Sequence, residues 1–198
     1  MKTVNLVLLI VGSVIIGFLI LSLIGYMAFS HAASSQLSQI TPPSTTETVK
    51  LLTYENLAAR VRIKYPSDWE KNSQVEGAIV IFTSPKTDAS NKSAVLAIGV
   101  QDLSAQPVTL EEYTKISLEE FKQTPSMELL DSSAATLDGK PAHKFIYSMK
   151  VGQYTIKNIG IYTIKGNTLY GLTYVAEKSK YDEFLATAQE MIDSFEII

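Results

Sequence analysis

The run ARVRIKYPSDW occupies residues 59–69 and governs the interpretation of the folded part of the chain. In this run apolar side chains alternate strictly with Arg60, Arg62 and Lys64, which is typical of a β-strand with one buried face. Pro66 ends the strand because it has no backbone N–H to donate to a neighbouring strand. The turn after it lets Trp69, the sole tryptophan, fold back over the core. The three basic residues are expected to form a solvated face rather than a binding strip.

Two more strands and a helix are predicted downstream. The apolar segments 78–83 and 94–101 are typical of strands joined by a polar loop. A helix is expected to begin after Thr109, because Thr109 and Glu112 have the capping-box spacing in which each side chain accepts a hydrogen bond from the other residue's backbone N–H. Apolar residues at helical spacing predict one buried face. The glutamates Glu111, Glu112, Glu119 and Glu120 are expected on the solvated face.

Residues 128–176 predict an antiparallel meander followed by a closing helix. Asp138-Gly139, Val151-Gly152 and Gly166-Asn167 each offer a residue that tolerates positive φ at hairpin spacing. Apolar residues at steps of three and four after Ser179, the expected N-cap, predict the helix. Strands in two groups with one internal and one terminal helix favour an α+β fold, an antiparallel β-sheet flanked by helices.

The N-terminal part differs from the rest of the chain. Residues 4–29 carry no charge, and as a helix they would extend roughly 39 Å, against about 30 Å for the hydrocarbon core of a bilayer. We therefore expect residues 1–32 to be a transmembrane anchor or a signal segment, preceding one folded domain over residues 50–198. A Ser/Thr/Pro-rich linker over residues 33–49 joins the two. A signal peptide has an apolar region of only about 7–15 residues, which favours the anchor, and Ser30-His31-Ala32 leaves cleavage open.

Few positive charges set the expected orientation. Lys2 and the free amino group precede the apolar stretch, so the positive-inside rule keeps the N-terminus cytoplasmic and the C-terminal domain extracytoplasmic. If the segment is cleaved, the domain is secreted. The expected partners are membrane lipid through residues 4–29 and a protein of the envelope. Basic and acidic residues are nearly balanced, 17 against 20, which argues against nucleic acid as a partner.

The residues that could carry chemistry are few. The chain has no cysteine, which excludes thiol catalysis and thiolate metal sites, and it has two histidines, His31 and His143. His143 is a weak metal candidate, because no second histidine is near it in sequence. The chain has no nucleophile elbow, Walker loop or dinucleotide-binding fingerprint, and Ser132 and Ser133 have no evident histidine base. We expect no enzymatic activity, no catalytic residue and no cofactor.

The pieces of the folded part resemble the PsbP-like proteins, which share a fold with Mog1. The resemblance rests on Tyr65-Pro66-x-x-Trp69, then Phe82-Thr83-Ser84-Pro85, the helix at Thr109 and Leu137-Asp138-Gly139-Lys140-Pro141-Ala142, and finally Met191-Ile192-Asp193-Ser194-Phe195, all in the family's order. It covers nearly all of residues 51–198. It implies a Mog1/PsbP-like α/β/α sandwich and a non-enzymatic accessory or binding role.

The sequence therefore predicts a membrane-tethered extracytoplasmic binding or assembly module, accessory to another envelope protein. An alternative is a small-ligand or lipid-binding domain with a cavity between sheet and helix, and a more remote one is a metal-assisted hydrolase using His143. The partner or ligand surface is expected to be aromatic: Trp69, Tyr147, Tyr154, Tyr162 and Tyr174. The sequence identifies neither the partner nor the oligomeric state.

Overall fold

The computed structural model describes residues 49–86 and 94–198. The expected anchor over residues 1–32 and almost all of the linker over 33–49 lie outside these ranges. Within them, the structure has no helix with the length and apolar character needed to cross a bilayer.

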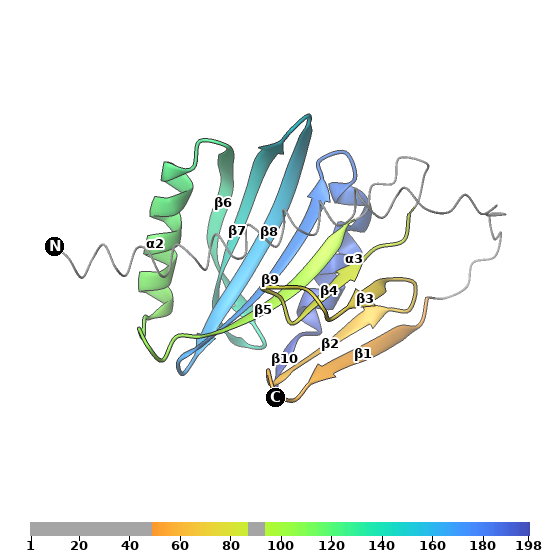
Figure 1. The fold of residues 1–198 in the computed structure, drawn as a ribbon, viewed down its shortest axis with the longest axis horizontal. Helices are drawn as coiled ribbons and strands as arrows, with labels where there is room; N and C mark the ends of the chain where they lie inside the picture. The colour runs from red at the N-terminus through yellow and green to blue at the C-terminus, as the bar shows by residue number, and fades with distance from the viewer. Residues whose placement is uncertain (1–48, 87–93) are drawn as a thin grey trace.

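In the described residues, two antiparallel sheets and two helices make up the fold (Figure 1). The seven-stranded sheet has the order β3-β4-β5-β9-β8-β7-β6. Its strands are β3 (Glu70–Asn72), β4 (Val80–Thr83), β5 (Val95–Asp102), β6 (Met127–Leu137), β7 (Lys140–Val151), β8 (Tyr154–Lys165) and β9 (Thr168–Glu177). The smaller sheet has the order β1-β2-β10, with β1 (Leu51–Asn56), β2 (Val61–Pro66) and β10 (Glu196–Ile197). The helices are α2 (Leu110–Gln123) and α3 (Tyr181–Asp193).

The two helices pack on opposite faces of the large sheet. Successive residues of a strand point to opposite faces, and Ile161 and Tyr162 of β8 accordingly belong to different apolar clusters. Ile161 lies in the larger cluster, which contains α3 and the apolar side of β1 and β2, whereas Tyr162 packs with α2. Figure 1 shows α3 behind the sheet and α2 beside β6 and β7. The predicted antiparallel α+β architecture is therefore confirmed for the described residues.

Hairpin turns lie where the sequence placed them. Asp138 and Gly139 have φ of 52° and 66°, and Gly152 and Gly166 have φ of 59° and 62°. The strand predicted to start at Ala59 is β2 and starts at Val61, because residues 57–60 form the turn that joins it to β1, a strand that the sequence analysis missed. Arg60 adopts a positive φ of 59° in that turn, which alternation of side chains alone does not reveal.

One of the two predicted helix caps is present. The Thr109 Oγ1 accepts a hydrogen bond from Glu112 N at 3.2 Å, and Thr109 N donates to Glu112 Oε2 at 2.8 Å, which confirms the capping box. The predicted cap at Ser179 is wrong, since Lys180 holds the N-cap position of α3. Strand β9 continues to Glu177, and the Ser179 hydroxyl donates to the Glu177 carboxylate at 3.0 Å instead of capping the helix.

Trp69 is buried, as its place after Pro66 suggested. It is 4% exposed, and its ring meets that of Phe184 on α3 edge-to-face, with centroids 6.0 Å apart. Trp69 N donates a hydrogen bond to Pro66 O at 3.0 Å, so the turn at the end of β2 brings the indole over the core.

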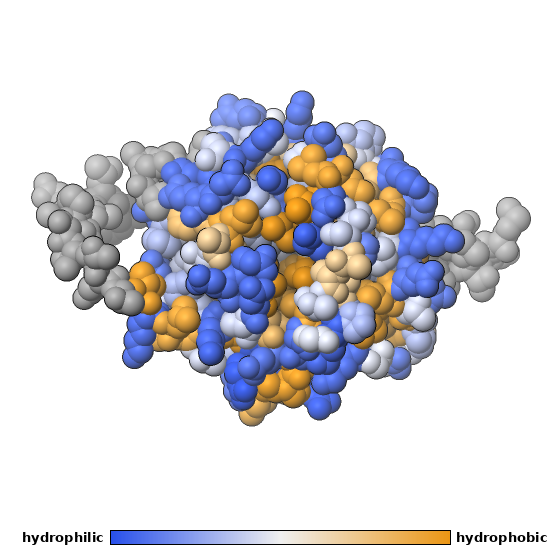
Figure 2. Space-filling view, turned by 180° about the vertical axis from the view of Figure 1, so that it is seen from behind, coloured by the Kyte–Doolittle hydropathy of each residue, from blue (hydrophilic) through white to orange (hydrophobic). Residues whose placement is uncertain are grey.

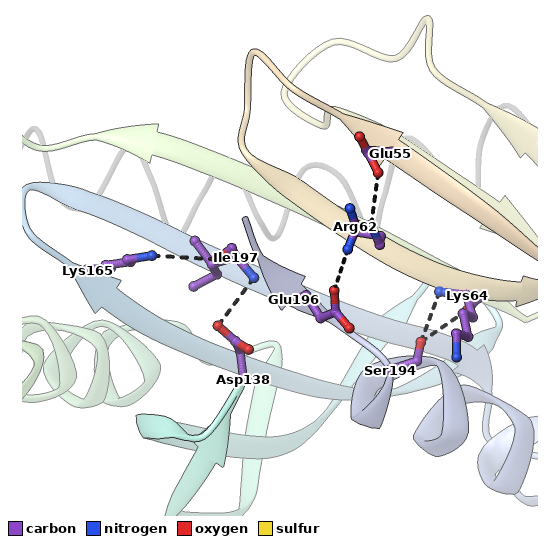
Figure 3. Close-up of polar contacts among 8 residues, drawn as sticks. All are labelled: Glu55, Arg62, Lys64, Asp138, Lys165, Ser194, Glu196 and Ile197. Atoms are coloured by element: carbon purple, nitrogen blue, oxygen red, sulfur yellow. Dashed lines mark hydrogen bonds and ion pairs between the residues drawn. The ribbon is translucent and has the colours of Figure 1, made fainter.

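Polar contacts join the C-terminal strand to distant parts of the chain (Figure 3). Arg62 donates to Glu55 at 2.8 Å and to Glu196 at 2.9 Å, so one arginine links β1, β2 and β10. Ser194 accepts from Lys64 N at 2.9 Å and ties the end of α3 to β2. All these groups are at least partly exposed, so the ion pairs add little to the stability of the fold. Their main effect is to set the register of β1 and β10 against β2.

Asp138 connects the β6–β7 hairpin to the same C-terminal strand. Its Oδ2 accepts hydrogen bonds from Lys140 Nζ and, at 3.3 Å, from Ile197 N. Burial alone would raise the pKa of Asp138, but these hydrogen bonds and the charges of Lys140 and Lys165 outweigh it and hold the pKa below its ordinary value of 3.8.

Replacing Asp138 by asparagine is therefore expected to cost stability in a pH-dependent way. Because the pKa is lower in the folded state, the carboxylate stabilises the fold above about pH 4, and this contribution disappears as the pH falls through the folded pKa. Asparagine tolerates the positive φ, so Asp138→Asn should lose about 1 kcal/mol at pH 7 and much less near pH 3. Urea unfolding at both pH values tests this, and an equal loss at both would contradict it.

Candidate functional site

A groove runs between α2 and the β6–β7 hairpin. Its volume is about 570 Å³, which falls in the range of about 300–1,000 Å³ usual for ligand sites. The helix contributes Leu110, Glu111, Thr114, Lys115, Leu118, Glu119 and Lys122, and the hairpin contributes Ala134, Ala135, Pro141, Ala142 and His143. The walls thus combine half-buried leucines with charges of both signs, a composition that suits an amphipathic segment of another protein.

Ser132 and His143 form a hydrogen-bonded pair beside this groove. The Ser132 Oγ lies 2.8 Å from His143 Nε2. The expectation that Ser132 has no histidine near it is therefore wrong. The two-residue turn at Asp138-Gly139 places His143 opposite Ala134, and Ser132 is the next residue along on the same face. This pairing can be derived from the hairpin register, and it is the signal that the search for sequence motifs missed.

The electrostatics of His143 favour a neutral ring. Burial lowers the pKa of His143 below 6.5, and the nearby Asp131 only partly opposes this. The ring also packs edge-to-face on Phe145, with centroids 4.8 Å apart. Nucleophilic catalysis needs a third group that orients the histidine and donors that stabilise an oxyanion. The contacts of His143 described above provide neither, so we assign the pair no catalytic role.

His143 has no cluster of metal ligands around it. In residues 49–86 and 94–198, no three histidine, aspartate or glutamate side chains lie close enough together to hold a metal ion. The remote hypothesis of a metal-assisted hydrolase therefore has no support from the described part of the chain.

A second, smaller cavity lies under α2. It holds about 50 Å³ and is lined by Tyr113, Ser117 and Phe121 of the helix and by residues of β7, β8 and β9, Tyr147 and Tyr162 among them. This volume is close to that of one or two water molecules. A cavity between helix and sheet does exist, as the ligand-binding alternative requires, but it is too small for a lipid.

The aromatic residues predicted as a binding surface do not lie together. Tyr147 and Tyr162 are 4% and 8% exposed and pack under α2. Tyr174 is fully buried on the opposite face with Trp69, and its hydroxyl donates to Tyr181 O at 2.7 Å. Tyr154 alone is half-buried, at the turn between β7 and β8. A binding role for these residues stays a prediction, and their burial limits the contact a partner can make with them.

Glu120 departs from the solvated helix face predicted for it. Its side chain is partly buried, and its Oε2 has no hydrogen-bond partner. Burial raises the pKa of Glu120 to about 7. The helical spacing that placed Glu119 in solvent leaves Glu120 at the margin of the buried stripe next to Phe121.

Glu120→Gln should therefore change how stability depends on pH. Between the ordinary pKa of 4.5 and the folded value of about 7, the folded state holds a proton that the unfolded state has released, so wild-type stability falls as the pH rises through this range. Glutamine does not titrate, so the variant lacks this fall in stability with rising pH. The variant should be more stable than the wild type at pH 8 and similar to it at pH 4, as measured by thermal unfolding across the range. A parallel pH dependence of both proteins would contradict the burial argument.

Comparison with solved structures supports the fold. Cyanobacterial PsbP (CyanoP) from Synechocystis sp. PCC 6803 aligns with a TM-score of 0.55 at 14% identity, covering 80% of this chain and 99% of that chain. LpqN, involved in cell envelope biogenesis of Mycobacterium tuberculosis, aligns with a TM-score of 0.52 at 14% identity, and the alignment covers 79% of this chain and 88% of LpqN. A Mog1 protein aligns with a TM-score of 0.50 at 11% identity, and the alignment covers 75% of this chain and 96% of the Mog1 chain. At these identities the likeness shows the fold alone.

Comparison with protein families gives a more specific result. A search of curated proteins found no match. The family described as PsbP-like protein matches residues 9–197, which is nearly the whole chain and includes the Tyr-Pro-x-x-Trp run and the groove. The hairpin at Asp138-Gly139 and the closing helix α3 follow each other in the order on which the resemblance described above rests. The chain belongs to the PsbP-like protein family.

Proposed function

We propose that this protein is a membrane-tethered, extracytoplasmic binding or assembly module without enzymatic activity, accessory to another protein of the envelope. The observation that carries the binding role is the groove between α2 and the β6–β7 hairpin. It is large, lies at the surface and is lined by rigid secondary structure. The uncharged stretch over residues 4–29 supplies the tether in this proposal.

The chemistry of the groove favours a protein partner over a small ligand. Leu110 and Leu118 offer apolar contact, and Glu111, Lys115 and Lys122 offer charge at its rim. A shallow surface of mixed character is typical of transient protein interfaces. The cavity under α2, of about 50 Å³, would have to expand several-fold to admit a lipid, so the ligand-binding alternative has less support.

The relatives are consistent with this proposal. LpqN, which shares the fold, is described as involved in cell envelope biogenesis, and CyanoP is a cyanobacterial PsbP. As part of the proposal, we extend to this chain only a role in the cell envelope.

Crosslinking in native membranes tests the groove. The full-length protein should recover a specific partner, and Ala134→Arg, which places a large cation in the groove at an exposed strand position, should reduce recovery about tenfold. Ala186→Arg is the matched control, because Ala186 is exposed on α3, on the other side of the sheet. Equal recovery with both variants would place the interface elsewhere, and recovery of no partner with the wild type would count against the binding role.

A further inference from the structure

Exposed large apolar side chains gather in two places on the described surface. One is the bulge of β6, at Leu129 and Leu130. The other surrounds β1, where Val49, Leu51 and Leu52 are 49%, 53% and 36% exposed, with Leu57 at the far end of the strand. We call Val49, Leu51 and Leu52, together with the adjacent Lys50 and Lys64, the β1 patch. Figure 2 shows apolar surface at this end of the molecule, next to the point where the described chain begins.

The β1 patch is apolar on both faces of its strand. Leu51 and Leu52 are consecutive, so their side chains point to opposite faces of the small sheet. Leu52 shares the face of Tyr54, which packs into the core, whereas Leu51 shares the outer face. Among the described strands, β1 pairs with β2 alone and so lies at the edge of the small sheet. The start of β1 therefore presents apolar groups on two sides, with Leu51 53% and Leu52 36% exposed.

Two lysines flank the leucines of the patch, and Asp68, beside Ser67, is the exposed carboxylate near them. Lys50 and Lys64 are exposed, and Lys64 lies opposite Thr53, diagonal to Leu51 on the outer face. The nearest carboxylate of β1, Glu55, is engaged by Arg62 at 2.8 Å. Leucines flanked by lysines suit a bilayer surface, where the apolar groups enter the interface and the lysines meet anionic headgroups.

The position of the patch in the chain points to the same partner. Only residues 30–48 separate it from the uncharged stretch that ends at Phe29. As an unstructured chain, a linker of that length would span about 24 Å on average, so this proposal places the start of β1 near the bilayer that residues 4–29 are proposed to enter. A hydrogen bond of 2.8 Å from Ser67 N to Lys50 O fixes the patch to the domain, so contact there orients the whole domain.

We propose that the β1 patch is a membrane-contacting surface that seats the domain on the bilayer into which its own N-terminal segment inserts. This inference rests on the proposed function, because it requires the tether. It leaves the groove beside α2, which lies at the opposite edge of the large sheet from β3 and β4, accessible to a protein partner.

Fluorescence quenching in vesicles tests the proposal. The full chain has no cysteine, so a single one at Ser67 or at Ser126, both exposed, can carry a fluorophore. Ser67 adjoins the patch and Ser126 lies in the loop between α2 and β6. In phosphatidylcholine–phosphatidylglycerol vesicles that contain a spin-labelled lipid, we expect the label at position 67 to be quenched about threefold more than the label at 126.

Paired variants separate patch contact from general adhesion. Leu51→Asp with Leu52→Asp, and separately Lys50→Glu with Lys64→Glu, should lower quenching at position 67 to the level at 126. The matched control, Leu129→Asp with Leu130→Asp, should leave it unchanged, because it alters the other exposed apolar site.

Flotation of the same vesicles distinguishes failure of the β1 patch proposal from failure of the tether proposal. Protein that floats with the vesicles but shows equal quenching at both positions would overturn the patch and leave the tether intact. Protein that does not float would overturn the tether, and this inference with it.

Discussion

Trp69→Ala is expected to lower the free energy of unfolding by about 3–5 kcal/mol, the largest loss that we predict for a single substitution. The indole is 4% exposed, packs edge-to-face on Phe184 and joins the end of β2 to α3. Removing it opens a cavity at the point where the small sheet, the large sheet and the helix meet. For a domain of this size the loss corresponds to about 10 °C in Tm.

Circular dichroism during urea unfolding measures the effect, because the variant lacks the only tryptophan and its fluorescence. Trp69→Phe is the matched control and should lose much less, since it keeps an aromatic contact with Phe184. Tyr154→Ala, at a half-buried turn position, should lose less than 1 kcal/mol. A change in the free energy of unfolding below 1 kcal/mol for Trp69→Ala would show that packing of the indole adds little to the stability of the core.

Asn158→Leu is expected to stabilise the fold by about 1–3 kcal/mol. Asn158 lies at the middle of β8, opposite Tyr147 on β7 and Val175 on β9, and its side chain is fully buried. Neither its Oδ1 nor its Nδ2 has a hydrogen-bond partner. A buried amide without partners loses its hydration and gains nothing in return, whereas leucine has a similar shape and no such cost.

Asn158→Asp provides the opposite test, because a buried carboxylate without a partner should destabilise strongly at pH 7. Thermal unfolding of the three proteins side by side measures both effects. If Asn158→Leu instead destabilises the protein, the amide of Asn158 makes a hydrogen bond when the protein is in solution. A bound water beside the cavity under α2 would be the first candidate for its partner.

The functional proposals use two separate regions of the surface. The groove lies between α2 and the β6–β7 hairpin, and the β1 patch belongs to the small sheet. The domain could therefore contact a bilayer and a protein partner at the same time. The crosslinking and quenching experiments address these regions independently, so either result stands without the other.

Local physics explains what the sequence determined alone. Hairpin turns require residues that tolerate positive φ, and Asp138-Gly139, Gly152 and Gly166 provide them within a few residues of chain. The capping box needs only the spacing of Thr109 and Glu112. Alternation and helical spacing then assigned most strands and both helices. Together with the Tyr-Pro-x-x-Trp run, these local signals were enough for the fold class and the family.

Contacts between distant residues decided the rest. Residue patterns alone could not assign α2 and α3 to opposite faces of the sheet, because the face depends on the path of the whole chain; only the resemblance to PsbP-like proteins implied that arrangement. For the same reason the sequence analysis misjudged Glu120, whose raised pKa comes from burial at a packed interface, and it missed the pair of Arg62 with Glu196, which are 134 residues apart. Of the predicted aromatic surface, Trp69 and Tyr174 pack in one core, Tyr147 and Tyr162 pack in the other, and Tyr154 lies at a turn. Local hydrogen bonds and backbone angles are encoded over a few residues, whereas burial is a property of the assembled layers, and the candidate groove exists only once those layers meet.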